Sequence, residues 1–532
     1  MAITDAVAAA CRDASGMTLI ADDAVARFEA LLGADAVRSA PEDLVDFLDP
    51  YPFGDQAEFA PGAVVSPSSV EEVQAIVRVA NELRVPLWPV SRGKNNGYGG
   101  ASPRVAGAVV VELTRMNRVL EVNEESAYAV VEPGVRFFDL YDHLRSNGHR
   151  LWASVPELGW GSVLGNGLER GLGYTPYGEH GTKHCGYEVV LPDGELLRTG
   201  MGAMANSASW HLYQPGYGPS VDGLFQQSNL GIVVKAGVWL MPTPETFMAV
   251  DISVPEFDDL QELIDRLRPL RLEGTVQSPA MIGEALGAAA HMGPRTPWYE
   301  GDGVAPESVV QKVMETFGIG RWTLFFGLYG PEARVAGDFA RVEEAFASIP
   351  GVDIKAASYP GDVAQEDVHP LHLTRAGIPG MHAEHLTDWR ERTPGTGAHV
   401  GFSPVLPLRG RDALQAAKSI RARVEEHGFD YMGAWHAGQR YMNHVVEIMW
   451  DRTDPEQVRA LRELFALLIT DAAALGHGEY RTHIAFMDLV AEQFDFNGHA
   501  LRRFNESIKD LLDPNGILAP GKQGIWPKGR RR

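Results

Sequence analysis

The most informative stretch of the chain is SRGKNNGYGG, Ser91–Gly100. It follows a short apolar run and combines glycines with amide and basic side chains, which are the ingredients of a loop whose backbone N–H groups hold phosphate oxygens. A pyrophosphate is therefore one candidate ligand. By composition alone, an ordinary Asn/Gly-rich turn is the commoner explanation.

Helical and extended patterns alternate on both sides of this loop. Before it, Val70–Leu83 has apolar residues at helical spacing. After it, Ala106–Met116 and Tyr128–Val135 have strand-like patterns. Phe137–Gly148 is again periodic and ends on a glycine that suits a left-handed helix cap. The pattern predicts interleaved α and β structure.

The pattern changes near Thr243, where we place a domain boundary. Beyond it, longer amphipathic stretches such as Asp258–Leu270 and Asp412–Gly428 alternate with strand-like runs such as Trp322–Gly330. The Gly/Pro-rich tail after Asp513 stays apolar, so we expect it to dock onto the body of the protein.

The segment Gly159–Gly178 is dense in glycine and aromatic residues and has no helical period. We therefore expect irregular backbone close to a flat or charged ligand rather than a helix. Within it, Gly165–Gly171 is spaced G-x-G-x-x-x-G, and no clear strand leads directly into it. This spacing does not fit a dinucleotide-binding fingerprint.

Composition excludes several classes of protein. The chain has 532 residues, 45% hydrophobic and 22% charged, which is typical of a folded protein of more than one domain. A net charge of −23 disfavours nucleic acid and anionic lipid as partners. Two cysteines, Cys11 and Cys185, cannot form a disulfide framework, and no apolar run approaches a membrane span. These features predict a cytoplasmic protein without a membrane anchor.

Two pairs of histidines could in principle bind a metal. His369 and His372 form one pair, and His382 and His385 form the other. Neither pair has the H-E-x-x-H spacing, and no third ligand is indicated. We assign no metal.

Long blocks of sequence, in order along nearly the whole chain, resemble the 4-phenol oxidizing flavoenzymes, the family that includes vanillyl-alcohol oxidase and 4-cresol dehydrogenase. Within that family, the sequence blocks most resemble those of bacterial eugenol and 4-alkylphenol oxidases. The blocks are SRGKNNGYGGASPRV (Ser91–Val105), VEPGVRFFDLY (Val131–Tyr141), PELGWGSVLGNGLERGLGYTPYGEH (Pro156–His180), DGLFQQSNLGIVVK (Asp222–Lys235), GAHVGFSP (Gly397–Pro404), GEYRTHIAFMD (Gly478–Asp488) and DPNGILAPGKQGIWP (Asp513–Pro527).

The resemblance implies an α+β flavoprotein of two domains. Residues 1–242 and 477–532 would form a vanillyl-alcohol-oxidase-type FAD-binding domain, and residues 243–476 a cap domain over the substrate. His399 matches the family position whose imidazole is bonded to the 8α carbon of the flavin, which implies covalent 8α-histidyl FAD. A histidine with a pKa near 6.5 supplies the neutral imidazole that such a bond needs. The expected FAD contacts are Arg92, Gly93, Lys94, Asn95, Asn96, Gly97, Pro156, Glu157, Gly161, Ser162, Asn166, Tyr177, Gly178, Gly231, Ile232, Val233, His399, Arg481 and Lys522.

The same resemblance implies a site for a phenolate. Tyr98, Tyr480 and Arg481 match the family's phenolate-binding trio, in which two O–H donors and a permanent cation favour the ionised phenol. Glu157 stands where other members carry an aspartate beside the flavin, and we expect it to act as the acid or base. Tyr174 matches an aromatic residue that lines the reacting side chain.

We therefore expect an FAD-dependent oxidase of para-substituted phenols. It would take hydride from the benzylic carbon, leave a quinone methide and reduce O2 to hydrogen peroxide. Expected substrates are 4-alkylphenols, 4-alkylguaiacols, eugenol-like compounds and 4-hydroxybenzyl alcohols, and a homodimer or higher homo-oligomer is expected. One alternative is a dehydrogenase subunit that passes electrons to a cytochrome. A non-catalytic flavin-binding protein and a hydrolase with a carboxylate pair are further alternatives.

Overall fold

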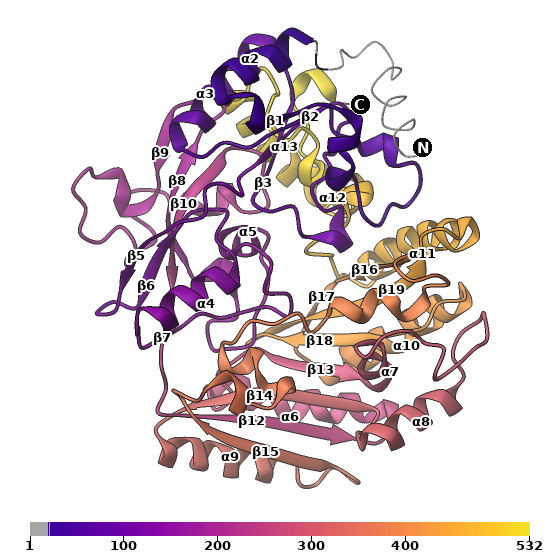
Figure 1. The fold of residues 1–532 in the computed structure, drawn as a ribbon. Coiled ribbons are helices and arrows are strands. Elements are labelled where there is room, and N and C mark those ends of the chain that lie inside the picture. The colour runs from indigo at the N-terminus through magenta and orange to yellow at the C-terminus, as the bar shows by residue number, and fades with distance from the viewer. Residues whose placement is uncertain (1–19, 21, 532) are drawn as a thin grey trace.

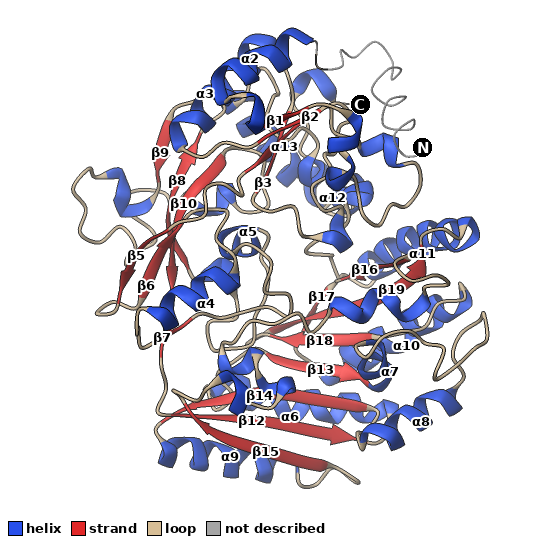
Figure 2. Cartoon of the chain, viewed as in Figure 1, coloured by secondary structure: helices blue, strands red, loops and turns tan. Residues whose placement is uncertain are grey.

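The computed structural model describes residue 20 and residues 22–531, so Cys11 and the first residues of the expected FAD-binding domain lie outside the described part. Helices and sheets are both abundant and form two large parts, one above the other in Figure 2. The expected α+β fold is confirmed. None of the described helices combines the length and apolar character needed to cross a membrane.

The first sheet carries the loop at Ser91. Two helices cover it, α2 (Asp22–Leu32) and α3 (Val70–Leu83), and their apolar residues pack on the strands. α3 begins where the Ser69 hydroxyl accepts a hydrogen bond from the Glu72 N–H, a standard N-cap. The strands lie in the order β1 (Val37–Arg38), β2 (Ala63–Val65), β4 (Val109–Glu112) and β3 (Leu87–Val90), with β2, β4 and β3 parallel.

A second, antiparallel sheet packs against α4 (Phe137–Ser146) and α5 (Val163–Leu168). Gly148 follows α4 with a φ of +71°, as the sequence predicts. The expectation that Gly159–Gly178 contains no helix is wrong over α5, because Ser162 Oγ caps the Gly165 N–H and Val163 and Leu164 are buried. The strand order is β5 (Val119–Asn123), β6 (Tyr128–Val131), β10 (Ile232–Trp239), β8 (His184–Val190) and β9 (Leu196–Arg198), with β7 (Leu151–Trp152) and β11 (Met241–Pro242) paired nearby.

The lower part of Figure 1 is built on a large antiparallel sheet. One face packs against α6 (Leu260–Glu273), α9 (Glu332–Phe346), α10 (Gly410–Glu426) and α11 (Pro455–Ala474). α7 (Ala285–Ala290) and α8 (Glu307–Phe317) lie beside it. The strand order is β15 (Asp353–Pro360), β12 (Thr246–Val254), β14 (Trp322–Gly330), β13 (Ala280–Glu284), β18 (Gly433–Ala437), β19 (Tyr441–Asp451) and β16 (Gly397–Phe402), and β17 (Val405–Pro407) also pairs with β19.

The C-terminal segment returns to the N-terminal part. In Figure 1 the yellow helices α12 (Met487–Glu492) and α13 (Phe496–Leu512) lie beside the indigo strands. The Leu87 N–H donates to the Ile517 carbonyl and the Ala519 N–H donates to the Leu87 carbonyl, each at 2.7 Å. The expected docking of the tail is therefore confirmed. The proposed domain limits at residues 242 and 477 stay predictions.

Candidate active site

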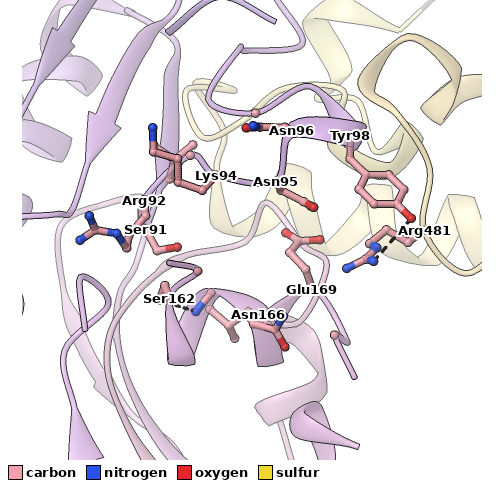
Figure 3. Close-up of a pocket in the computed structure, with 18 of the residues that line it drawn as sticks. Ser91, Arg92, Lys94, Asn95, Asn96, Tyr98, Ser162, Asn166, Glu169 and Arg481 are labelled. Atoms are coloured by element: carbon pink, nitrogen blue, oxygen red, sulfur yellow. Dashed lines mark hydrogen bonds between the residues drawn. The ribbon is translucent and has the colours of Figure 1, made fainter. Parts of the chain in front are cut away.

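A cavity of about 440 Å³ lies between the loop at Ser91 and the large antiparallel sheet. Its walls come from segments that are far apart in the sequence, from Tyr51 to Gln523. Figure 3 shows Arg92 and Lys94 toward one end of the Ser91–Tyr98 loop, and Tyr98 with Arg481 at the other. The cavity thus has a basic end and an end with phenolic and guanidinium groups.

Most residues predicted from the sequence line this cavity. Tyr177 and Gly178 do not: Tyr177 lines a separate small cavity with His180 and Lys183. The predicted residues that line the large cavity are Arg92, Gly93, Lys94, Asn95, Asn96, Gly97, Tyr98, Pro156, Glu157, Gly161, Ser162, Asn166, Tyr174, Gly231, Ile232, Val233, His399, Tyr480, Arg481 and Lys522.

The Ser91–Tyr98 loop is shaped to approach a ligand closely. Gly93 has a φ of +63°, and a Cβ there would lie 2.6 Å from the Ala101 side chain, so only glycine fits. A Cβ on Gly97 would lie 2.9 Å from Cε1 of His399. The Arg92 Nε is buried and has no hydrogen-bond partner within the described part of the chain, although its Nη1 donates to the Gly134 carbonyl. The Arg92 guanidinium is therefore anchored by backbone at the wall of the cavity.

Tyr98, Tyr480 and Arg481 line the cavity together. The Arg481 guanidinium carbon lies 4.3 Å from the ring centre of Tyr98 and 5.5 Å from that of Tyr480, and Arg481 Nη2 is 3.5 Å from Tyr98 Oη. Burial raises the pKa of Tyr98 to about 12, even though the Arg481 charge acts in the opposite direction. At neutral pH the site therefore offers a phenolic O–H donor beside a permanent cation.

Glu157 and Tyr174 form a hydrogen-bonded pair in the same cavity. Tyr174 Oη donates to Glu157 Oε1 at 2.6 Å. Burial and the neighbouring Glu157 carboxylate raise the pKa of Tyr174 well above its ordinary value, so its hydroxyl stays protonated. The pair can hold a water molecule or move a proton at Glu157.

The large sheet turns one set of alternating residues toward the cavity. On β16, Ala398, Val400 and Phe402 pack under the helices, whereas His399 lines the cavity. The same alternation on β18 and β19 brings His436 and Glu447 to the cavity. His399 Nδ1 lies 3.0 Å from Glu447 Oε2.

Three residues that line the cavity were not predicted from the sequence: Glu447, His436 and Glu169. Glu447 sits inside the apolar strand pattern HVVEIMW, and a charged residue at such a position needs a buried partner, which was the available signal. Glu169 makes an ion pair with Lys522 at 2.5 Å. Burial together with the Arg481 charge lowers the pKa of His436 to about 3, so it is neutral.

The residues present fit FAD. The cavity combines a glycine-rich loop, the basic residues Arg92 and Lys94, backbone from Gly231–Val233 and the imidazole of His399. Backbone donors and cations suit a pyrophosphate, and glycine backbone suits the close approach of a flat ring.

Comparison with known proteins agrees with this fit. Residues 61–200 match the family described as FAD binding domain, and residues 404–523 match FAD linked oxidases, C-terminal domain. The chain is 36% identical over 506 residues to the flavoprotein subunit of 4-cresol dehydrogenase (hydroxylating) from Pseudomonas putida, covering 94% of this chain and 95% of that protein.

Two solved structures are also similar over nearly the whole chain. A 4-ethylphenol oxidase from Gulosibacter chungangensis, solved with isoeugenol, has 39% identity and a TM-score of 0.91, covering 96% of this chain and 98% of its own. A p-cresol methylhydroxylase with substrate bound has 34% identity and a TM-score of 0.88, and the match covers 95% of this chain and 97% of that one. The expected family resemblance is confirmed: the chain belongs to the vanillyl-alcohol oxidase and p-cresol methylhydroxylase family of FAD-dependent oxidoreductases.

Proposed function

We propose that the protein is an oxidase that removes a hydride from the benzylic carbon of para-substituted phenols and uses O2 as the final electron acceptor. The observation that carries this proposal is the convergence of Tyr98, Tyr480 and Arg481 on one cavity. The relatives named for 4-cresol and 4-ethylphenol support a phenolic substrate with an alkyl group in the para position.

Binding and activation of the phenol follow from the same three side chains. A free phenol has a pKa near 10. Arg481 supplies a positive charge that does not titrate, and the O–H groups of Tyr98 and Tyr480 donate to the oxygen, so the ionised form is favoured on binding. Ionisation makes the ring electron-rich and helps hydride leave the para benzylic carbon. The substrate is left as a neutral quinone methide.

Glu157 handles the proton in the step that follows. Because Tyr174 fixes one oxygen of its carboxylate, the other oxygen is left to accept a proton. It can take the proton from a water molecule that adds to the quinone methide, which gives an alcohol. It can instead take a proton from the next carbon of the side chain, which gives an alkene.

FAD, when bound, supplies the two-electron acceptor for the hydride. The residues that would hold it are the loop Ser91–Gly97, Lys522, the backbone of Gly231–Val233 and the imidazole of His399. We propose that His399 carries the flavin covalently. The support is its place on the cavity face of β16, where Gly97 leaves room for the ring.

The acceptor separates this proposal from its main alternative. The Pseudomonas putida relative is named as a dehydrogenase subunit, whereas the Gulosibacter chungangensis relative is named as an oxidase. We propose O2 because this chain has His399 at the position of the expected flavin link. A homodimer is proposed as the assembly, as the resemblance implies.

The test uses purified holoenzyme with 4-ethylphenol and its O-methyl ether. Oxygen uptake with stoichiometric peroxide is expected with the phenol and not with the ether, because only the phenol can ionise. Flavin that is reduced by the phenol but reoxidised by a cytochrome and not by O2 would replace the oxidase by the dehydrogenase. Equal reaction of phenol and ether would refute the phenolate mechanism.

A further inference from the structure

Glu447 is a partly buried carboxylate that the reaction above does not use. It lies on β19, which pairs with β16 so that Gly401 faces Glu447 and His399 faces Met449. Glu447 and His399 are therefore diagonal neighbours on one face of the sheet. Glu447 Oε2 lies 3.0 Å from His399 Nδ1, within hydrogen-bond distance.

The carboxylate of Glu447 is held in its charged form. Burial alone would raise its pKa, but the contact with His399 and the charge of Arg481 lower it below the ordinary value. A Cβ on Gly401 would lie 3.3 Å from Glu447 Oε1 and 2.9 Å from Tyr98 Oη. The missing side chain at Gly401 thus leaves room for the carboxylate between His399 and the phenolate site.

This contact determines which nitrogen of His399 is free. An anionic carboxylate accepts a hydrogen bond, so Nδ1 carries the proton and Nε2 keeps its lone pair. The ring cannot turn easily, because it packs on Tyr51 with ring centres 5.5 Å apart and its Cε1 edge faces Gly97. The contact thus holds the ring in one orientation, with Nδ1 as the donor to Glu447 and Nε2 as the nitrogen left to act as nucleophile.

We infer that Glu447 positions His399 and accepts its Nδ1 proton when the imidazole becomes attached to FAD. This inference rests on the proposed covalent link. In the step, a bond forms between Nε2 and the 8α carbon, that carbon loses one proton, and Nδ1 gives its proton to Glu447. The two electrons that remain on the flavin pass to O2, which takes up the two protons and leaves as hydrogen peroxide.

The experiment measures attachment rather than turnover. Wild-type protein and the variants E447Q, E447D, E447A and H399A are purified with their FAD. The flavin that stays with the acid-precipitated polypeptide is compared with total flavin, at once and during incubation in air. E479Q is the matched control, because it makes the same change at a buried carboxyl that contacts the Ser403 N–H and not His399.

We expect E447Q to bind as much total FAD as wild type but to attach it covalently at least about 100-fold more slowly. A rate loss of this size is usual when a residue that accepts a proton is removed. E447D should recover part of the rate, and formate added to E447A should recover part of it too, which a purely structural role would not allow. E479Q should attach FAD at the wild-type rate.

Three outcomes would overturn the inference, and they are distinguishable. If E447Q attaches FAD as fast as wild type while H399A attaches none, Glu447 has no role although the covalent link stands. If the wild-type polypeptide itself keeps no flavin in acid, the proposed link fails and this inference fails with it. If E447Q does not fold, the absence of rescue in both E447D and formate-treated E447A overturns it.

Discussion

Replacing Arg481 by glutamine is the most direct test of the phenolate site. The substitution keeps hydrogen-bond donors near the phenol oxygen but removes the positive charge. Arg481 Nη2 lies 3.5 Å from Tyr98 Oη, so a phenolate oxygen bound by both groups would be about 4 Å from the charge. At that separation and an effective dielectric constant of about 20, two unit charges interact by about 4 kcal/mol.

Part of this interaction is lost because Arg481 itself was desolvated on folding. A net loss of about 3 kcal/mol is consistent with a charged hydrogen bond and corresponds to about 100-fold in rate. We therefore expect the second-order rate constant of flavin reduction by 4-ethylphenol to fall about 100-fold in R481Q. The same rate constant should fall less in R481K, because lysine keeps the positive charge although it lacks the planar guanidinium.

The assay is stopped-flow loss of flavin absorbance without oxygen, which does not depend on the final acceptor. Total flavin content serves as the control for folding and FAD binding, and we expect the substitution to lower the rate with phenols far more than it alters flavin content. A rate for R481Q within threefold of wild type, at equal flavin content, would refute the argument that a fixed charge drives the reaction.

Three further predictions concern other buried groups. Y174F removes the 2.6 Å hydrogen bond from Tyr174 to Glu157. The ratio of alcohol to alkene product, measured by chromatography, should change more than the rate of flavin reduction does. An unchanged product ratio would contradict the role of Tyr174 in holding the Glu157 carboxylate. Burial raises the pKa of Glu479 to about 8, so the folded state holds a proton that the unfolded state releases. The free energy of unfolding should therefore fall as pH rises from about 4.5 to about 8. In thermal unfolding experiments, the E479Q variant should lose less stability than wild type over this pH range. An equal loss in both proteins would contradict the raised pKa of Glu479. Lys509 and Asp513 form a 2.7 Å ion pair in which both side chains are 0% exposed, and K509M leaves the Asp513 carboxylate without its cation. The free energy of unfolding, measured with a chemical denaturant, should fall by about 3–5 kcal/mol. A fall of less than about 1 kcal/mol would show that the ion pair does not stabilise the fold.

Local patterns in the sequence predicted the local structure well. The apolar spacing of Val70–Leu83 coincides with α3, and the extended runs before and after the Ser91 loop became β3 and β4. These patterns depend on neighbouring residues along the chain, so they can be interpreted without knowing the fold. The sequence did not predict α5 because a helix of six residues is too short to show a helical period. This helix is stabilised by the Ser162 cap instead.

The sequence by itself determined the family, the FAD cofactor and the chemical types of the expected site residues, because long blocks of residues carry that information in order. Only the tertiary structure decided how those residues meet and which further residues they contact. Tyr98 and Arg481 are 383 positions apart, and His399 meets Glu447 only through the register of β16 on β19. Contacts of that kind are decided by strand pairing and packing, and each partner taken alone gives no local sign of the other.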